Sequence, residues 1–120
     1  IVRDLKVWTP LEGTSFSVNA HPVDGAQKTT GEYQRAEMKE LADASRYKMT
    51  LGAGPATVVV GGQEFARSEY TIQFGEQTLH ACRFDRFMGG YAVNLQAMAP
   101  SKEKLRTAEA ILTSLALEPA

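Results

Sequence analysis

The chain has 120 residues, of which 43% are hydrophobic and 22% charged, as is typical of a single globular domain, here expected over residues 1–120. The formal net charge of −1 disfavours nucleic acid and anionic membrane surfaces as partners. The single cysteine, Cys82, excludes an internal disulfide, and no apolar run is long enough to cross a bilayer.

The first part of the chain predicts one strand followed by one helix. Apolar and polar side chains alternate over Thr14–Ala20, which indicates a half-buried strand. Thr29 and Glu32 have the spacing of a capping box, so a helix is predicted to begin there. A thin apolar stripe follows at helical spacing, formed by Gln34, Met38, Leu41, Ala42, Ser45 and Met49.

The middle of the chain predicts a loop at Gly52–Pro55 and then four strands. A turn or bulge is expected at Gly61–Gly62, after the first of them. The strands are predicted over Thr57–Val60, Glu64–Phe74, Thr78–Arg86 and Tyr91–Met98.

The last part of the chain predicts a second helix, capped by Ser101. Its apolar face is formed by Leu105, Ala108, Ile111, Leu112 and Leu115. Leu115 and Leu117 flank Ala116, which hints at a short final strand. Strands followed by a covering helix predict an α+β fold, a mostly antiparallel β-sheet flanked by helices.

Hairpin geometry suggests a pairing for the charged strand residues. A three-residue loop at Gly75–Gln77 sets Glu69 opposite Arg83 and Arg67 opposite Asp85, and both pairs are opposite in sign. We therefore expect a solvated charge ladder on one face of the sheet. A loop at residues 87–90 in the next hairpin would keep the opposite face apolar, with Tyr70, Ile72, Phe74, Cys82, Phe84, Tyr91, Val93 and Leu95.

Catalytic or metal chemistry is weakly supported by the sequence. His80 and Cys82 share a strand face, but a zinc site needs three or four ligands, and His21 is the other histidine. Ser68, His80 and Asp85 have the residue types of a hydrolase triad but are predicted on different faces. The sequence GAGPAT lacks the complete pattern of a phosphate-binding loop. We therefore expect no metal site and no cofactor.

Two tyrosines of the first predicted helix lie away from its apolar stripe. Tyr33 and Tyr47 could mark a surface for a partner protein, because aromatic residues are enriched at interfaces. The ordinary alternative is that they pack onto a neighbouring loop or the first strand. The candidate partner surface consists of Tyr33, Tyr47, Arg67, Glu69, Arg83 and Asp85.

Five segments carry a resemblance to a known family through their order and spacing: SFSVNAHPV, GEYQRAEMKEL, VVVGGQEFARSEYTI, GGYAVNLQAMAPSKEKL and AEAILTSLALEP. From about Ser15 to Pro119 the chain resembles the PsbP-like superfamily, which includes DcrB-like periplasmic proteins and the Mog family of Ran-GTPase-binding proteins. The resemblance implies an α/β/α sandwich without a shared active site. The order WTP at Trp8–Pro10 departs from the family's proline–tryptophan corner, which leaves open whether the first strand is absent or altered.

The resemblance implies a non-catalytic binding or accessory domain that contacts another protein in an extracytoplasmic, periplasmic compartment of a bacterium. The chain opens at IVRDLKVW without Met, so we expect a processed product that has lost a signal peptide or a lipid-attachment cysteine. The alternative is a carrier of a small apolar ligand in a pocket between sheet and helix, lined by Tyr70, Phe84 and Leu112. An enzyme using His80 and Cys82 ranks third.

Overall fold

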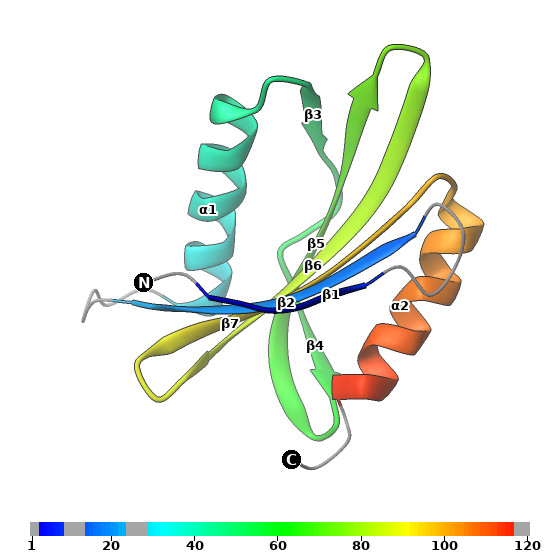
Figure 1. Ribbon diagram of the computed structural model, residues 1–120. Coiled ribbons are helices and arrows are strands. Elements are labelled where there is room, and N and C mark those ends of the chain that lie inside the picture. The colour runs from blue at the N-terminus through cyan, green and yellow to red at the C-terminus, as the bar shows by residue number, and fades with distance from the viewer. Residues whose placement is uncertain (1–2, 9–13, 24–28, 117–120) are drawn as a thin grey trace.

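The computed structural model describes residues 3–8, 14–23 and 29–116. Within these ranges the chain forms seven strands and two helices (Figure 1). In chain order they are β1 (Arg3–Trp8), β2 (Ser15–Pro22), α1 (Thr30–Ala44), β3 (Lys48–Leu51), β4 (Ala56–Val60), β5 (Gln63–Phe74), β6 (Gln77–Met88), β7 (Tyr91–Ala99) and α2 (Lys102–Ala116).

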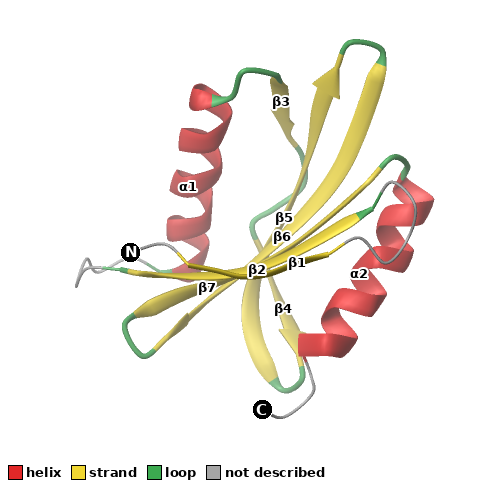
Figure 2. Cartoon of the chain, in the orientation of Figure 1, coloured by secondary structure: helices red, strands yellow, loops and turns green. Residues whose placement is uncertain are grey.

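All described strands belong to one antiparallel sheet with the order β1-β2-β7-β6-β5-β3. The edge of β5 is shared, because β3 pairs with its second half and β4 with its first half. Figure 2 shows β3 and β4 following one another along β5, with a short loop between them. The sheet is strongly twisted, with α1 on one face and α2 on the other.

The two faces of the sheet have different cores. On the α2 face the core is large and apolar, formed by Phe16, Phe65, Cys82, Phe84, Leu95, Ala97, Ala99, Leu105, Ala108 and Leu112. On the α1 face a smaller cluster of Met38, Tyr70 and Ala81 is joined by Met49, Ile72 and Met98. Apolar burial stabilises a fold by about 25 cal/mol per Å², so α2 is held mainly by packing.

The helix starts are as predicted. Thr29 is the N-cap of α1, and its hydroxyl accepts a hydrogen bond from the Glu32 amide while the Glu32 carboxylate accepts one from the Thr29 amide. At α2, the hydroxyl of Ser101 accepts from the backbone amide of Lys104. Local capping patterns are therefore sufficient to locate both starts.

Three predicted boundaries need correction. The first helix ends at Ala44, and Met49 lies in strand β3, so the apolar stripe was extended too far. Leu115 and Ala116 are part of α2 rather than a final strand, and residue 117 lies outside the described residues. A first strand is present as β1, although the sequence order at Trp8 had left this open.

The predicted strand register is wrong by one residue in the β5–β6 hairpin. The turn has two residues, Gly75 and Glu76, so that Phe74 pairs with Gln77 and Glu69 with Cys82. Gly75 adopts a φ of 58°, as the first position of a type II′ hairpin turn requires. The β6–β7 turn is also shorter than predicted, but by two residues. The pairing of β6 with β7 therefore shifts, while the side chains predicted to share a face still do so.

A slip of one residue exchanges the two faces of a strand. Arg83 and Asp85, predicted to face water, lie under α1 with exposed fractions of 3% and 0%. The alternation of polar and apolar residues was misinterpreted because the prediction assumed that one face of the sheet is exposed to solvent. Here helices cover both faces, and the more polar face is also buried.

Candidate functional site

A buried polar network lies between α1 and the sheet, centred on Asp85 of β6. The Asp85 carboxylate accepts a hydrogen bond from Arg83 Nε at 2.7 Å and from Gln34 Nε2 at 3.0 Å. Asn94 Nδ2 of β7 donates to its other oxygen at 3.3 Å. Asp85 is fully buried, so this charge depends on its partners for stabilisation.

Gln34 joins α1 to four groups of the sheet, one of which is the Asp85 carboxylate. Its amide nitrogen also lies within hydrogen-bonding distance of the carbonyl oxygens of Ala66, at 2.8 Å, and Arg83, at 3.1 Å, so its two hydrogens are shared among three acceptors. Its amide oxygen accepts a hydrogen bond from the hydroxyl of Ser68 at 2.5 Å. Because these bonds are directional, they fix the position of α1 on the sheet.

Arg83 also approaches Glu37 of α1 at 3.8 Å. Burial alone would lower the pKa of the Arg83 guanidinium, but the charge and hydrogen bonds of Asp85 outweigh it and raise the pKa. Tyr33 donates a hydrogen bond to Glu37, and burial together with that carboxylate raises the pKa of its phenol. The Arg83 guanidinium is therefore held in its ionised form by the carboxyl groups around it.

The network continues along β7 toward the C-terminal half of α1. Tyr70 donates its hydroxyl hydrogen to Gln96 Oε1 at 2.5 Å, and Gln96 Nε2 donates to Asn94 Oδ1 at 2.9 Å. Burial raises the pKa of Tyr70 to about 12. These polar groups satisfy one another and need no further partner.

An apolar groove of about 340 Å³ lies at the end of the network formed by Tyr70 and Gln96. It is lined by Leu41 and Ala44 of α1, the C-cap residue Ser45, Met49 of β3, Tyr70 and Ile72 of β5, and Gln96 and Met98 of β7. Leu41 remains 45% exposed at its rim. Nearby, Tyr47 packs on Phe74 with ring centroids 4.2 Å apart and remains 49% exposed.

A second charged cluster joins the sheet to α2. Arg67 of β5 donates two hydrogen bonds to Glu109 of α2, at 2.7 and 2.8 Å, and one to Glu69 at 2.9 Å. Burial alone would raise the pKa of Glu69, but the hydrogen bond and charge of Arg67 hold it below its ordinary value. Arg67 also lies 5.7 Å above the ring of Phe84. This cluster anchors the helix.

The predicted partner surface is divided by the structure. Arg83 and Asp85 are buried under α1 and cannot meet a partner, and Arg67 and Glu69 pair with groups on the opposite face. Tyr33 packs edge-on against Phe87, with ring centroids 5.2 Å apart. Of the six predicted residues, Tyr47 is the most accessible to solvent.

The predicted ligand pocket is also wrong in its composition. Tyr70 belongs to the α1 face, whereas Phe84 and Leu112 are 1% exposed in the core of the α2 face. The three side chains therefore cannot line one cavity. The register slip is again the cause, since it had placed Tyr70 and Phe84 on the same face.

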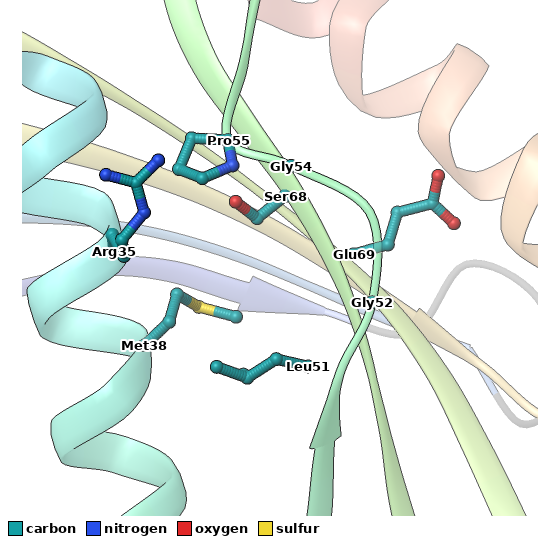
Figure 3. A pocket seen from close by; sticks show the side chains of 8 residues that line it. All are labelled: Arg35, Met38, Leu51, Gly52, Gly54, Pro55, Ser68 and Glu69. Atoms are coloured by element: carbon teal, nitrogen blue, oxygen red, sulfur yellow. The ribbon is translucent and has the colours of Figure 1, made fainter.

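A small cavity of about 40 Å³ lies between α1 and the loop that joins β3 to β4, and it is lined by Arg35, Met38, Leu51, Gly52, Gly54, Pro55, Ser68 and Glu69. Figure 3 shows Met38 and Leu51 near each other on one side, while the Glu69 carboxylate points away toward α2. This volume accommodates water rather than an organic ligand.

The three residues of hydrolase-triad type, Ser68, His80 and Asp85, are not brought together by the structure, in line with their predicted separation on different faces. Ser68 and Asp85 lie on the α1 face with Gln34, whereas His80 shares the α2 face with Cys82. Within the described residues, no group of three or more His, Cys, Asp and Glu side chains is arranged to bind a metal ion.

The Cys82 thiol is expected to be unreactive in the folded protein. It is fully buried, and burial raises its pKa from 9.0 to about 12. The fold favours the protonated thiol, so this stabilisation is complete below pH 9 and is lost as the pH rises toward 12.

A thiol reagent such as dithionitrobenzoate at pH 8 should therefore label Cys82 at the rate of unfolding. Rapid labelling without denaturant would contradict the burial.

The groove could not be found from local sequence patterns, because its residues come from four elements. The sequence did contain one signal of the buried polar network under α1. Gln34 begins the apolar stripe of the helix, and a glutamine on that face predicts polar partners on the facing sheet. No helix in the described ranges has the length and apolar character of a membrane span.

Comparison with solved structures identifies the fold. PA94 from Pseudomonas aeruginosa, a protein of unknown function described provisionally as a regulator, matches with a TM-score of 0.66 and 12% identity, covering 100% of this chain and 81% of that one. Cyanobacterial PsbP (CyanoP) from Synechocystis sp. PCC 6803 matches with a TM-score of 0.66 and 17% identity, covering 97% and 78%. No protein-family model and no curated protein matches the chain. The chain thus has a PsbP-like α+β fold, as predicted, and identities this low show the fold alone.

Proposed function

We propose that this chain is a non-catalytic accessory domain that binds another protein through the groove beside α1, in an extracytoplasmic compartment of a bacterium. The observation that carries the proposal is the groove itself. Leu41 is 45% exposed above a floor of buried or half-buried Tyr70, Ile72 and Met98. Exposed apolar surface on a rigid, well-packed base is typical of interaction sites.

The shape of the groove favours a partner protein over a small ligand. Sites for small molecules bury most of the ligand surface, but Leu41 and Tyr47 leave this end of the α1 face open to water. The polar floor groups, Tyr70 and Gln96, already bond to each other. The groove therefore suits one or two apolar side chains presented by a larger surface.

A binding role without catalysis is supported by how the reactive side chains are used. Asp85 is paired with Arg83, and Cys82 is buried with a raised pKa. The solved structures with this fold, a provisional regulator and a cyanobacterial PsbP, also fit an accessory role.

The extracytoplasmic location is supported by the resemblance and by the state of Cys82. A buried lone thiol is protected from forming intermolecular disulfides in an oxidising compartment. Fractionation of host cells that express the tagged protein from its own locus tests this part of the proposal. Recovery with the cytoplasmic fraction alone would contradict it.

The binding proposal is tested by site-directed photo-crosslinking in the host. A benzoylphenylalanine at position 41 should yield one defined polypeptide adduct. The same probe at position 88 should not, although Met88 is similarly exposed, at 51%, on the β6–β7 hairpin. Leu41→Glu should then weaken binding of the identified polypeptide at least tenfold, because a charge replaces an apolar contact at the rim.

The remaining outcomes distinguish the alternatives. An adduct of small mass at position 41 would replace the proposal with the carrier of an apolar ligand. Equal crosslinking at positions 41 and 88, or none at either, would show that the groove is not the contact surface. Met88→Glu is the matched variant and should leave binding unchanged.

A further inference from the structure

The outer edge of β4 is an unusual feature of this sheet. Among the described strands β4 pairs with β5 alone, so the other side of its backbone is open. Unpaired backbone donors and acceptors at a sheet edge can pair with a strand from another chain.

The side chains of β4 do nothing to prevent such pairing. Its five residues read ATVVV, without a charge, and Val59 is 68% exposed, the most exposed of the large hydrophobic residues described. The other edge strands do carry charges: Arg3, Asp4 and Lys6 occur in β1, and Lys48 begins β3. Proteins commonly protect edge strands with charged residues, lysine above all.

We propose that β4 pairs with β4 of a second copy of this chain, in antiparallel orientation about a two-fold axis at Val58. In this register Val58 meets Val58, Thr57 meets Val59, and Ala56 meets Val60. Residues directly opposite in an antiparallel pair share a face, so β-branched side chains meet in every pair except that of Ala56 with Val60, and no like charges meet. A two-fold interface must be self-complementary, and β4 meets this requirement because its residues pair symmetrically about Val58.

The α2 face beside β4 adds a second contact. A groove of about 310 Å³ there is lined by Val58, Val59, Val60, Gly61, Arg67, Phe84, Glu109 and Thr113. Val58 and Val60 already pack against the apolar core of this face. The valines of the second copy would extend this apolar surface across the interface between the two copies. The formal net charge of −1 produces little repulsion between copies.

The expected dimer is weak, because one five-residue strand pair forms a small interface. Sedimentation equilibrium of the whole chain, from micromolar to millimolar concentration, should show a monomer–dimer equilibrium with a dissociation constant on the order of 100 µM. Val59→Lys should weaken dimerisation at least tenfold. Met88→Lys is the matched control, since it places the same charge on another exposed apolar site, and it should dimerise like the unmodified chain.

A crosslinking measurement tests the register independently. Opposed residues in an antiparallel pair have Cα atoms about 4.5–5.5 Å apart, within disulfide reach. Val58→Cys should therefore form a covalent dimer under mild oxidation, whereas Met88→Cys should not. Cys82 is buried and does not compete.

Three results would overturn the proposal. One is a wild-type chain that stays monomeric to 1 mM, roughly ten times the expected dissociation constant. Another is unchanged dimerisation of Val59→Lys, which would place the interface elsewhere. The third is equal disulfide formation by the Val58→Cys and Met88→Cys variants. The β4 edge and the groove beside α1 are separate surfaces, so failure here leaves the crosslinking result at position 41 unaffected.

Discussion

Asp85→Ala is expected to reduce the free energy of unfolding by about 3–5 kcal/mol, because it leaves the Arg83 charge buried without its main partner. The same change removes the carboxylate that accepts hydrogen bonds from Gln34 and Asn94. Urea denaturation followed by circular dichroism measures the effect. Asp43→Ala, at an exposed position of α1, is the control and should change stability little.

A double variant separates charge burial from lost packing. Arg83→Met combined with Asp85→Ala removes the unpaired charge and should be more stable than Asp85→Ala alone. If the double variant is less stable than the single one, the loss comes from packing or from Gln34 and Asn94. The ionic explanation would then be wrong.

Gly54→Ala is expected to cost about 3 kcal/mol or more, since strain and overpacking act together at this position. Gly54 has a φ of 111°, and an added Cβ would lie 2.5 Å from the carbonyl oxygen of Arg67 and 2.8 Å from Ser68 Cα. Both atoms belong to the backbone of β5, which cannot retreat without breaking its pairing with β6. Thermal or urea unfolding measures the loss.

Gly62→Ala provides the matched control for the close contact. Gly62 also has a positive φ, of 77°, but an added Cβ would have no neighbour within 4 Å. This substitution should cost only about 1–2 kcal/mol, from backbone strain alone. Equal losses at the two glycines would mean that the loop at Gly54 can move away from β5.

The fold was largely predictable because its signals are local. The Thr29–Glu32 capping box and the apolar face of α2 each lie within a few turns of helix. Five of the seven described strands were found for the same reason, by alternation and by glycine pairs at turns, whereas β3 was not predicted and β1 was left open. The predicted α+β class with an antiparallel sheet follows from these elements and their order.

The candidate site was not predictable to the same degree, because it depends on strand register. The choice between a three-residue and a two-residue turn at Gly75 decides whether Arg83 and Asp85 face water or α1. Both registers give reasonable cross-strand pairs, so pairing energies of roughly 0.2–1 kcal/mol could not decide between them. Gln34, an amide in an apolar stripe, would have favoured the register that gives it partners.

The contrast between the two faces of the sheet has a consequence for how this sequence can vary. On the α2 side, Leu105 and Leu112 are held by shape and volume, so other aliphatic residues of similar size can replace them at modest cost. On the α1 side, Gln34 and Asp85 are held by matched donors and acceptors, which hardly any other side chains reproduce. Homologous sequences should therefore drift freely in the apolar half of the interior while retaining residue identity in the polar half.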